Sequence, residues 1–372
     1  YQYFFEQMHM DDAIYADESI YEYPMQQGGG NDGRPYSFGR PSSGGSKAAY
    51  PCKSYGQGRI NPAYFYGVFD PNDMRRDVSI TMTGSNGKGV EKLIPFVPNS
   101  KAEGGGLTLN KWDENRQANP WVAAQRKSGI NGPYMRMSEV YLGYAEVCAA
   151  LGDVVTGKQY LKTVRERSFP QGLADTDGFI ASFGNDLVRA IIEERGFEYA
   201  GEGDRRWTLI RSGYLPEDIK RIKDMTKAMM DGLATKGYYE FENGNIISAY
   251  IWTKLVDAKT IYGHRLTAQC PMDKVNDPVL YPGWRGQKDN WEEMGLNYGN
   301  SAPATNLAIK GLFEIVSEEE AASLESQGYA KVNWGIDLVD YRDEYDKYLF
   351  WDYDYVSAPI YLWPFTPNVM AA

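Results

Sequence analysis

The chain has 372 residues, of which 42% are hydrophobic and 24% are charged, and its formal net charge is −11. That length is sufficient for a large hydrophobic core and for two lobes. No apolar run approaches the roughly 18 residues that a membrane-spanning helix needs, which excludes a transmembrane helix. The acidic balance, with no basic patch to neutralise phosphates, excludes nucleic acid as a partner.

Aromatic residues are unusually frequent, because 29 Tyr, 9 Trp and 14 Phe make up 14% of the chain. Many of them stand outside helical patterns, in stretches rich in Gly, Pro and Asn. Tyr and Trp offer a flat apolar face with a polar group at its edge, which suits the C–H face of a pyranose ring. The alternative is that loop aromatics fasten irregular segments to a helical scaffold. As a set, these residues favour a binding surface.

Residues 1–133 are predicted to be a loop-rich segment with short strands. A strand is expected at residues 18–23, and a long loop follows over residues 24–67, which include Gly28-Gly29-Gly30. Loops longer than about 15 residues are uncommon in compact domains and are often functional. This loop is therefore the first place to expect a binding site.

A β-hairpin is predicted after this loop, because strand-like residues 78–82 and 90–94 flank Asn86-Gly87. The neighbouring Ser85 and Lys88 give the turn a superficial likeness to a phosphate-binding loop. The glycine spacing and the following Ser or Thr of such a loop are missing, so the hairpin is the better interpretation.

Residues 134–213 are predicted to be a helical core of the tetratricopeptide type. Apolar side chains recur every three or four residues along its first helix, at Tyr134, Met137, Tyr141, Tyr144, Cys148 and Leu151. Gly152 suits the end of that helix. A shorter helix follows and stops before Pro170, with Val164 facing inwards and Arg165 outwards. Antiparallel helix pairs of this size are the unit of a helical solenoid.

A third helical segment carries a row of glutamates. It continues a helix expected over residues 186–192, and its glutamates are Glu194, Glu198 and Glu202. Four arginines accompany them, at positions 195, 205, 206 and 211. Such a row repels itself unless cations neutralise it. We therefore predict that these arginines bridge between helices and that the cluster is structural, not catalytic.

Residues 214–372 are predicted to be a loop-rich C-terminal region with short helices and a hairpin. An amphipathic helix is expected over residues 216–233. Asn243-Gly244 then stands between two strand-like runs and predicts a second hairpin. Ser317 opens a capping box with three glutamates after it, which predicts the start of a short helix.

Catalytic and metal-binding patterns are sparse. The two histidines are far apart, and neither has a companion at ligand spacing. Asp352 with Asp354, or Asp70 with Asp73, could supply oxygen ligands to calcium, but neither pair matches an EF-hand loop. No pair of carboxylates stands out as a glycosidase site. We predict no catalytic residues, no metal site and no cofactor, with calcium as the alternative that stays open.

Several segments share their order and spacing with a known family. Within the helical core they are RMSEVYL at 136–142, VRER at 164–167 and ERGFEYAGEGDR at 194–205. Outside it they are FDPNDMRRD at 69–77 and LWPFT at 362–366. Together they resemble the SusD/RagB family, the outer-membrane nutrient-binding lipoproteins of Bacteroidota. Thr208 and Tyr199 depart from the family pattern, which has Asp and Leu there, and both look like positions of helix packing.

The resemblance implies a fold that is mainly α and SusD-like, with tetratricopeptide-type helix pairs, long irregular loops and a few short β-hairpins. It also implies that this chain corresponds to the middle and C-terminal part of the family, since residues 18–23 already resemble a mid-protein strand. The N-terminal part, with the lipid anchor and most helix pairs, is expected to be absent from this chain.

The resemblance further implies a function, namely non-catalytic glycan binding at the cell surface. Such a protein delivers an oligosaccharide to a TonB-dependent outer-membrane transporter of the SusC type. Its expected location is the exposed surface of the outer membrane, where the anchor on the missing part would hold it. A lid protein that captures peptides or other nutrients is an open alternative, and a carbohydrate-active enzyme is a further one.

Glycan-binding members of the family line their site partly with aromatics from the loop before the FDPNDMRRD-like segment. In this chain that loop is residues 24–67. We expect the ligand to contact four of its aromatic residues, namely Tyr36, Phe38, Tyr50 and Tyr55, with Arg40 as a hydrogen-bond donor. Trp284 and Trp291, in a later loop, are the next candidates. For each of these residues the alternative is inward packing against the helices.

Overall fold

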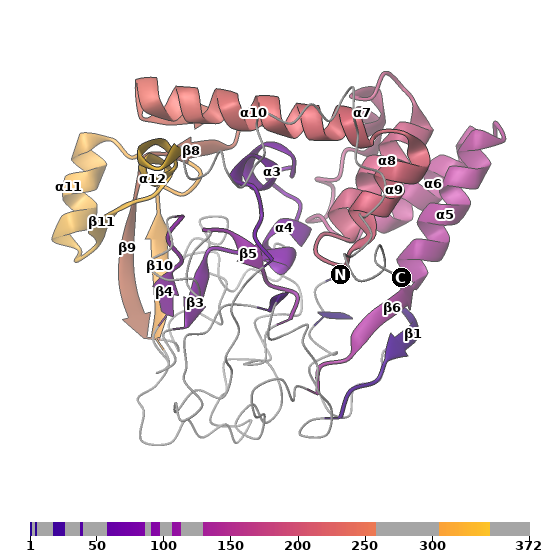
Figure 1. Ribbon diagram of the computed structural model, residues 1–372, viewed down its shortest axis with the longest axis horizontal. Coiled ribbons are helices and arrows are strands. Elements are labelled where there is room, and N and C mark those ends of the chain that lie inside the picture. Colours follow the sequence, from indigo (N-terminus) through magenta and orange to yellow (C-terminus); the bar gives the residue numbers. More distant parts are fainter. Residues whose placement is uncertain are drawn as a thin grey trace, which may run out of the picture.

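The structure of the protein is a computed structural model, which describes residues 1, 4–5, 18–26, 38–39, 58–85, 91–96, 106–112, 129–257 and 305–342. This described part is mainly α, and its strands are short. In Figure 1, helices α5 (Met137–Ala150) and α6 (Val154–Glu166) stand at one end and a three-stranded sheet at the other. The long helix α10 (Leu215–Lys236) runs between the two ends.

Helices α5 and α6 form the antiparallel pair that the sequence predicts. Gly152 in their connection has a φ of +87°, a left-handed conformation that favours glycine. Asp153 then caps α6 by accepting a hydrogen bond from the Thr156 amide at 3.1 Å. Helix α8 (Leu187–Glu198) packs against both. The side chains buried between the three helices include Leu142, Ala145, Leu161, Val164, Ala190 and Ile191.

A two-stranded ribbon precedes α5, where the sequence predicts the first turn of the helix. Strand β1 (Ser19–Tyr23), which confirms the predicted strand, pairs antiparallel with β6 (Gly132–Arg136). Tyr134 therefore lies on a strand and not on the helix. Pairing with β1 keeps the chain extended as far as Arg136, so α5 begins only at Met137.

Two further corrections concern the direction in which side chains face. Tyr144 and Leu151 belong to the predicted buried stripe of α5, but they are 50% and 82% exposed. The face that meets α6 and α8 is instead centred on Leu142 and Ala145. Arg165 of α6, which we predict to face outwards, is buried because it pairs with Glu194 of α8 at 2.9 Å.

The predicted glutamate row is interrupted after its second member. Helix α8 ends at Glu198, and Gly201 and Gly203 have φ angles of +83° and +92° in the turn that leads to α9 (Asp204–Ser212). Glycine tolerates these left-handed conformations. Glu202 consequently lies in the turn, although its carboxylate joins the same group of charges as Glu198.

Two local predictions in the C-terminal region are confirmed. Helix α10 covers the predicted residues 216–233 and extends slightly beyond them. Strands β7 (Tyr238–Glu240) and β8 (Ile246–Ser248) form the predicted hairpin. Its turn contains Asn243-Gly244, where the glycine has a φ of +82°.

The three-stranded sheet is antiparallel, with β9 (Tyr250–Asp257) in the centre. Strand β9 pairs with β10 (Thr305–Lys310) on one side and with β11 (Ala330–Asn333) on the other. Helix α11 (Glu318–Ser326) connects the two outer strands. Ser317 caps this helix, as the sequence predicts, by accepting a hydrogen bond from an amide of its first turn.

The predicted first hairpin is present but displaced along the chain. Its arms are residues 83–85 and 91–93, because the preceding segment begins as a short helix. The Asp73 carboxylate accepts the Arg75 amide at 3.0 Å and so starts that helix. The remaining elements are α3 (Pro62–Gly67), α4 (Arg75–Ser79), α7 (Thr176–Ala181), α12 (Gly335–Asp340), β2 (Ile80–Thr81), β3 (Thr83–Ser85), β4 (Glu91–Leu93) and β5 (Thr108–Leu109).

The main hydrophobic core joins α3, α10 and the C-terminal elements. Tyr66 of α3 stacks on Phe241, with ring centroids 6.0 Å apart, and accepts a hydrogen bond from Trp334 Nε1 at 2.8 Å. Other members of this core are Phe65, Phe69, Met82, Phe96, Leu107, Met229, Ile251 and Leu312. The core thus holds described residues between 63 and 107 against α10 and the C-terminal elements.

Candidate functional site

Most of the predicted ligand-binding residues lie outside the described part of the chain. They are Tyr36, Arg40, Tyr50, Tyr55, Trp284 and Trp291. Phe38 is described, and its side chain is 46% exposed beside Gly58. The binding role of this loop therefore stays a prediction, and Phe38 is the one predicted contact whose exposure the structure describes.

The β1–β6 ribbon carries an exposed aromatic surface that we name the tyrosine ribbon. It consists of Tyr21, Tyr23 and Tyr134, which are 55%, 60% and 76% exposed. The rings of Tyr21 and Tyr134 meet edge to face, with centroids 5.5 Å apart and planes at 85°. Exposed tyrosines held in a fixed mutual geometry present both ring faces and hydroxyl groups to a ligand.

An irregularity in the strand pairing accompanies this arrangement. Tyr21 is opposite Met135, whereas the next residue, Glu22, is opposite Pro133. Tyr134 is skipped in the register, as in a β-bulge, a feature that redirects side chains. The sequence pattern does not single out Tyr134 as a surface residue, because its spacing fits the helical stripe equally well.

Polar contacts hold the ribbon at its end. The Glu22 carboxylate accepts a hydrogen bond from Asn131 Nδ2 at 3.0 Å, and Asn131 Oδ1 accepts the Met25 amide at 2.9 Å. The chain then enters the segment of residues 27–57, to which most of the predicted loop aromatics belong. The tyrosine ribbon and the predicted loop site are thus consecutive along the chain.

A buried arginine–glutamate network lies next to the ribbon and is centred on Glu198. One oxygen, Oε1, accepts hydrogen bonds from Arg136 at 2.7 Å and from Arg167 at 2.6 Å. The other, Oε2, accepts from Arg167 at 3.1 Å and from Arg75 at 3.3 Å. The Glu198 side chain has no exposed surface. Both of its carboxylate oxygens are therefore saturated by cations.

The other two glutamates of the row extend this network. Glu194 pairs with Arg75 at 2.6 Å, and also with Arg165. Glu202 pairs with Lys111 at 2.5 Å and with Arg136 at 2.9 Å. These cations come from α4, α6, β6 and the segment after β5, so the network ties distant parts of the chain to α8.

The arginines near the row in sequence have other partners, which corrects part of the prediction. Arg195 pairs with Asp204 at 2.5 Å. Arg205 pairs with Glu193 and with Asp218 of α10, and Arg211 of α9 pairs with Glu146 of α5. Arg205 and Arg211 do bridge between helices, as predicted, but neither contacts the glutamate row.

The electrostatics of the network favour a structural role. Burial alone would raise the pKa of Glu198, but Arg167 and Arg136 outweigh it and hold this pKa well below its ordinary value. A carboxylate that stays ionised and fully hydrogen-bonded has no free lone pair for a substrate proton. We find no group of three or more His, Cys, Asp or Glu in the described ranges that could hold a metal ion.

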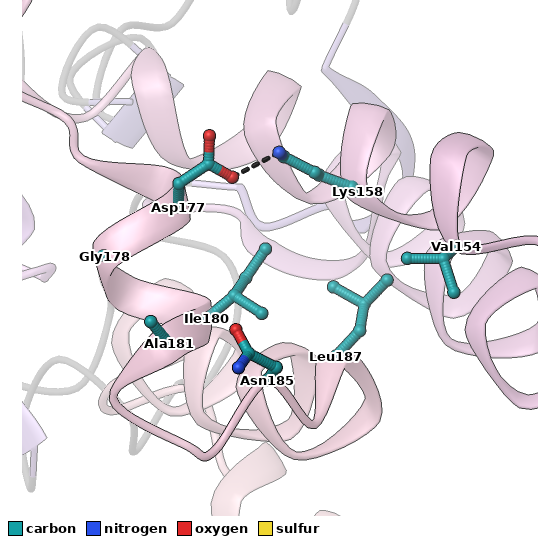
Figure 2. A pocket seen from close by; sticks show the side chains of 8 residues that line it. All are labelled: Val154, Lys158, Asp177, Gly178, Ile180, Ala181, Asn185 and Leu187. Carbon is teal, nitrogen blue, oxygen red and sulfur yellow. Dashed lines mark ion pairs between the residues drawn. The ribbon is translucent and has the colours of Figure 1, made fainter.

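An open cavity of about 530 Å³ lies between α6, α7 and the start of α8 (Figure 2). Val154, Ile180 and Leu187 line it, and the Lys158–Asp177 ion pair crosses its rim, as Figure 2 shows. This aliphatic cavity has no aromatic side chain in its lining. It therefore offers little to the C–H face of a sugar.

In the parts of the chain described above, no helix is long and apolar enough to cross a membrane.

The fold defines a mainly α protein with tetratricopeptide-type helix pairs, as predicted. The chain belongs to the SusD family, whose sequence model matches residues 11–365. SusD-like protein P25 of Formosa agariphila is 28% identical over 160 residues, which are 43% of this chain and 26% of that protein.

Solved structures of SusD-like proteins are also similar to this chain. A SusD homolog from Bacteroides thetaiotaomicron is 18% identical, with a TM-score of 0.40, over 60% of this chain and 46% of that one. Surface glycan-binding protein A from the same organism, in complex with laminarihexaose, is 19% identical, with a TM-score of 0.39, over 57% and 46%. The chain thus spans about half the length of these structures and about a quarter of the curated relative.

Proposed function

We propose that this protein is a non-catalytic glycan-binding protein of the cell surface, which delivers oligosaccharides to a TonB-dependent transporter of the SusC type. The observation that carries the proposal is the match to the SusD family over residues 11–365. In this proposal the protein lies at the outside of the outer membrane, held by a lipid anchor.

The tyrosine ribbon supports glycan binding by its chemistry. Large apolar side chains that stay exposed in a group mark interaction surfaces. Tyr21 and Tyr134 offer two ring faces at right angles, so an oligosaccharide could stack one residue on each. The predicted loop aromatics, from Tyr36 to Tyr55, are proposed as further contacts of the same ligand.

The test is calorimetric titration with a panel of oligosaccharides and peptides, beginning with laminarihexaose. We expect oligosaccharide binding, and a Tyr21→Ala/Tyr134→Ala variant should bind at least about tenfold more weakly, since each stacked ring is worth about 0.5–1.5 kcal/mol beyond the area that it buries. Tyr341→Ala is the matched control, because Tyr341 is 47% exposed and lies far from the ribbon in sequence. Binding of peptides but of no glycan would support the nutrient-lid alternative instead.

The absence of catalysis is part of the proposal. Within the described residues, the buried carboxylates of Glu194 and Glu198 are engaged by arginines and are unsuited to act as a general acid. Prolonged incubation with the oligosaccharide that binds should release no shorter product by chromatography. Cleavage that disappears on mutation of a single carboxylate would contradict this part.

Delivery to a transporter requires a second surface, and the outer face of α5 offers one. Its apolar residues are spaced by four, three and four positions, at Val140, Tyr144, Val147 and Leu151, and are 39%, 50%, 54% and 82% exposed. We expect Val147→Glu to abolish co-purification with a co-expressed SusC-type transporter and to leave glycan affinity unchanged. Undiminished co-purification would move the transporter contact to another face.

A further inference from the structure

A second cavity, which we name the mixed cavity, lies on the other side of α7 from the aliphatic cavity. Its volume is about 360 Å³, and it is bounded by the end of α3, α7, α8 and α10. Gly178 lines both cavities, whereas Ala181 lines only the aliphatic one and Ser182 only the mixed one. Cavities that hold small molecules start at about 300 Å³, so this one has room for a single small ligand.

Aromatic rings form one wall of the mixed cavity. Phe179 and Phe183 meet edge to face, with centroids 5.2 Å apart, and Phe197 follows at 6.0 Å from Phe179. Phe179 and Phe183 are only partly buried, so part of their surface is free. Such a wall suits a flat ring with C–H groups on its face.

The opposite chemistry is supplied by two guanidinium groups, the buried one of Arg165 and that of Arg221, whose side chain is 34% exposed. Arg165 is 4% exposed, its guanidinium carbon lies 3.9 Å from the centroid of the Phe179 ring, and its Nη1 donates to Glu194. Its Nε finds no hydrogen-bond partner among the described residues, and neither does Nε of Arg221. Because both Nε atoms are closed to solvent, a ligand would instead meet the rest of the partly exposed Arg221 guanidinium.

Carboxylates in the same lining provide acceptors. Asp70 accepts a hydrogen bond from the Asn72 amide at 2.8 Å, which leaves capacity on its carboxylate. Asp175 uses one oxygen to cap α7 through the Gly178 amide. Donors and acceptors therefore stand around one cavity that also has an aromatic wall.

The mixture of charges selects the kind of ligand. The carboxylates of Asp70 and Asp175 disfavour an anion, and the guanidinium groups of Arg165 and Arg221 disfavour a cation. A neutral molecule with many hydroxyl groups satisfies both sets, because each hydroxyl donates and accepts. We propose that the mixed cavity binds one neutral monosaccharide unit, with its C–H face on Phe183 and its hydroxyls towards Asp70 and Arg221. This proposal rests on the proposed function as a glycan-binding protein.

The test uses two tryptophan substitutions at adjacent positions, Ala181, the last residue of α7, and Ser182, its C-cap. Ser182→Trp fills the mixed cavity, and Ala181→Trp fills the aliphatic cavity as its matched control. Neutral hexoses, each at millimolar concentration, are the probes, and binding is measured by saturation-transfer NMR and by titration of amide shifts. We expect saturable binding by the unaltered protein, a loss of at least tenfold in Ser182→Trp and no change in Ala181→Trp.

A milder variant keeps the test conclusive if a tryptophan variant misfolds. Asp70→Asn retains the oxygen that accepts the Asn72 amide but removes the charge, and it should weaken hexose binding several-fold with an unchanged melting temperature. The absence of saturable binding of any hexose, or equal loss in both tryptophan variants, would overturn the proposal. Intact oligosaccharide binding that depends on Tyr21 but not on Ser182 would overturn it and leave the proposed function standing. Failure to bind any glycan at all would instead refute the proposed function.

Discussion

Arg136 and Tyr134 lie only two positions apart on strand β6, but one belongs to a buried, charged region and the other to an exposed, aromatic one. Arg136 is 2% exposed and joins the arginine–glutamate network, whereas Tyr134 is 76% exposed and belongs to the tyrosine ribbon. In the network a costly burial of charge is compensated by complete pairing. In the ribbon a large apolar surface is left without cover. The first arrangement maintains the fold, and the second has no evident structural purpose, which makes it the better place to expect a ligand.

The largest effect should follow from breaking the network at its centre. Glu198→Ala leaves the buried guanidinium group of Arg136 and the half-buried one of Arg167 without this carboxylate, so we expect a loss of about 3–5 kcal/mol in the free energy of unfolding. Urea unfolding followed by circular dichroism measures it. Glycan affinity per folded molecule should not change. Weaker binding at unaltered stability would show that the network itself takes part in binding.

The pH dependence of stability sharpens the same contrast. Burial alone would raise the pKa of Glu198, but Arg167 and Arg136 hold it well below its ordinary value. A carboxyl of this kind stabilises the folded state above its unfolded pKa of about 4.3, and the contribution is lost as the pH falls through the folded pKa. The unfolding free energy should thus decline below pH ~4.3. In Glu198→Gln the decline should be shallower, and parallel curves for the two proteins would contradict this assignment.

The loop prediction gives the next effect. Tyr36→Ala together with Tyr50→Ala should weaken glycan binding at least about tenfold while far-UV circular dichroism stays unchanged, since each ring contributes about 0.5–1.5 kcal/mol beyond the area that it buries. Combining this variant with Tyr21→Ala tests whether the loop and the ribbon bind one ligand. Coupled losses indicate a shared ligand, and unaltered affinity in the loop variant confines the site to the described ribbon or to the Trp284 loop.

The smallest effect should come from an exposed ion pair outside the network. Arg211 and Glu146 connect α9 to α5, but the Arg211 side chain is 47% exposed. Glu146→Gln should therefore lower the free energy of unfolding by at most about 1 kcal/mol. A loss as large as that of Glu198→Ala would show that exposure does not separate the two kinds of pair in this protein.

Predictions from the sequence succeeded where the signal and the element lie close together in the chain. Ser317 caps α11 through an amide three residues on, and Asn243-Gly244 supplies the turn between two adjacent strands. The boundaries between elements were misplaced where a local pattern had two interpretations. Tyr134 fits the apolar spacing of α5 but is held in a strand by β1, which lies far earlier in the chain.

The sequence by itself determined the helix pair, the glycine turns, the caps and the family, because each depends on residues within a few turns or on a fixed order of motifs. Only the tertiary structure decided which charges meet and which aromatics stay exposed. Glu198 carries the same side chain as any surface glutamate, and it is buried because Arg75, Arg136 and Arg167 approach it from three separate elements. Burial is a property of what the rest of the chain places opposite a residue, and that information is not local.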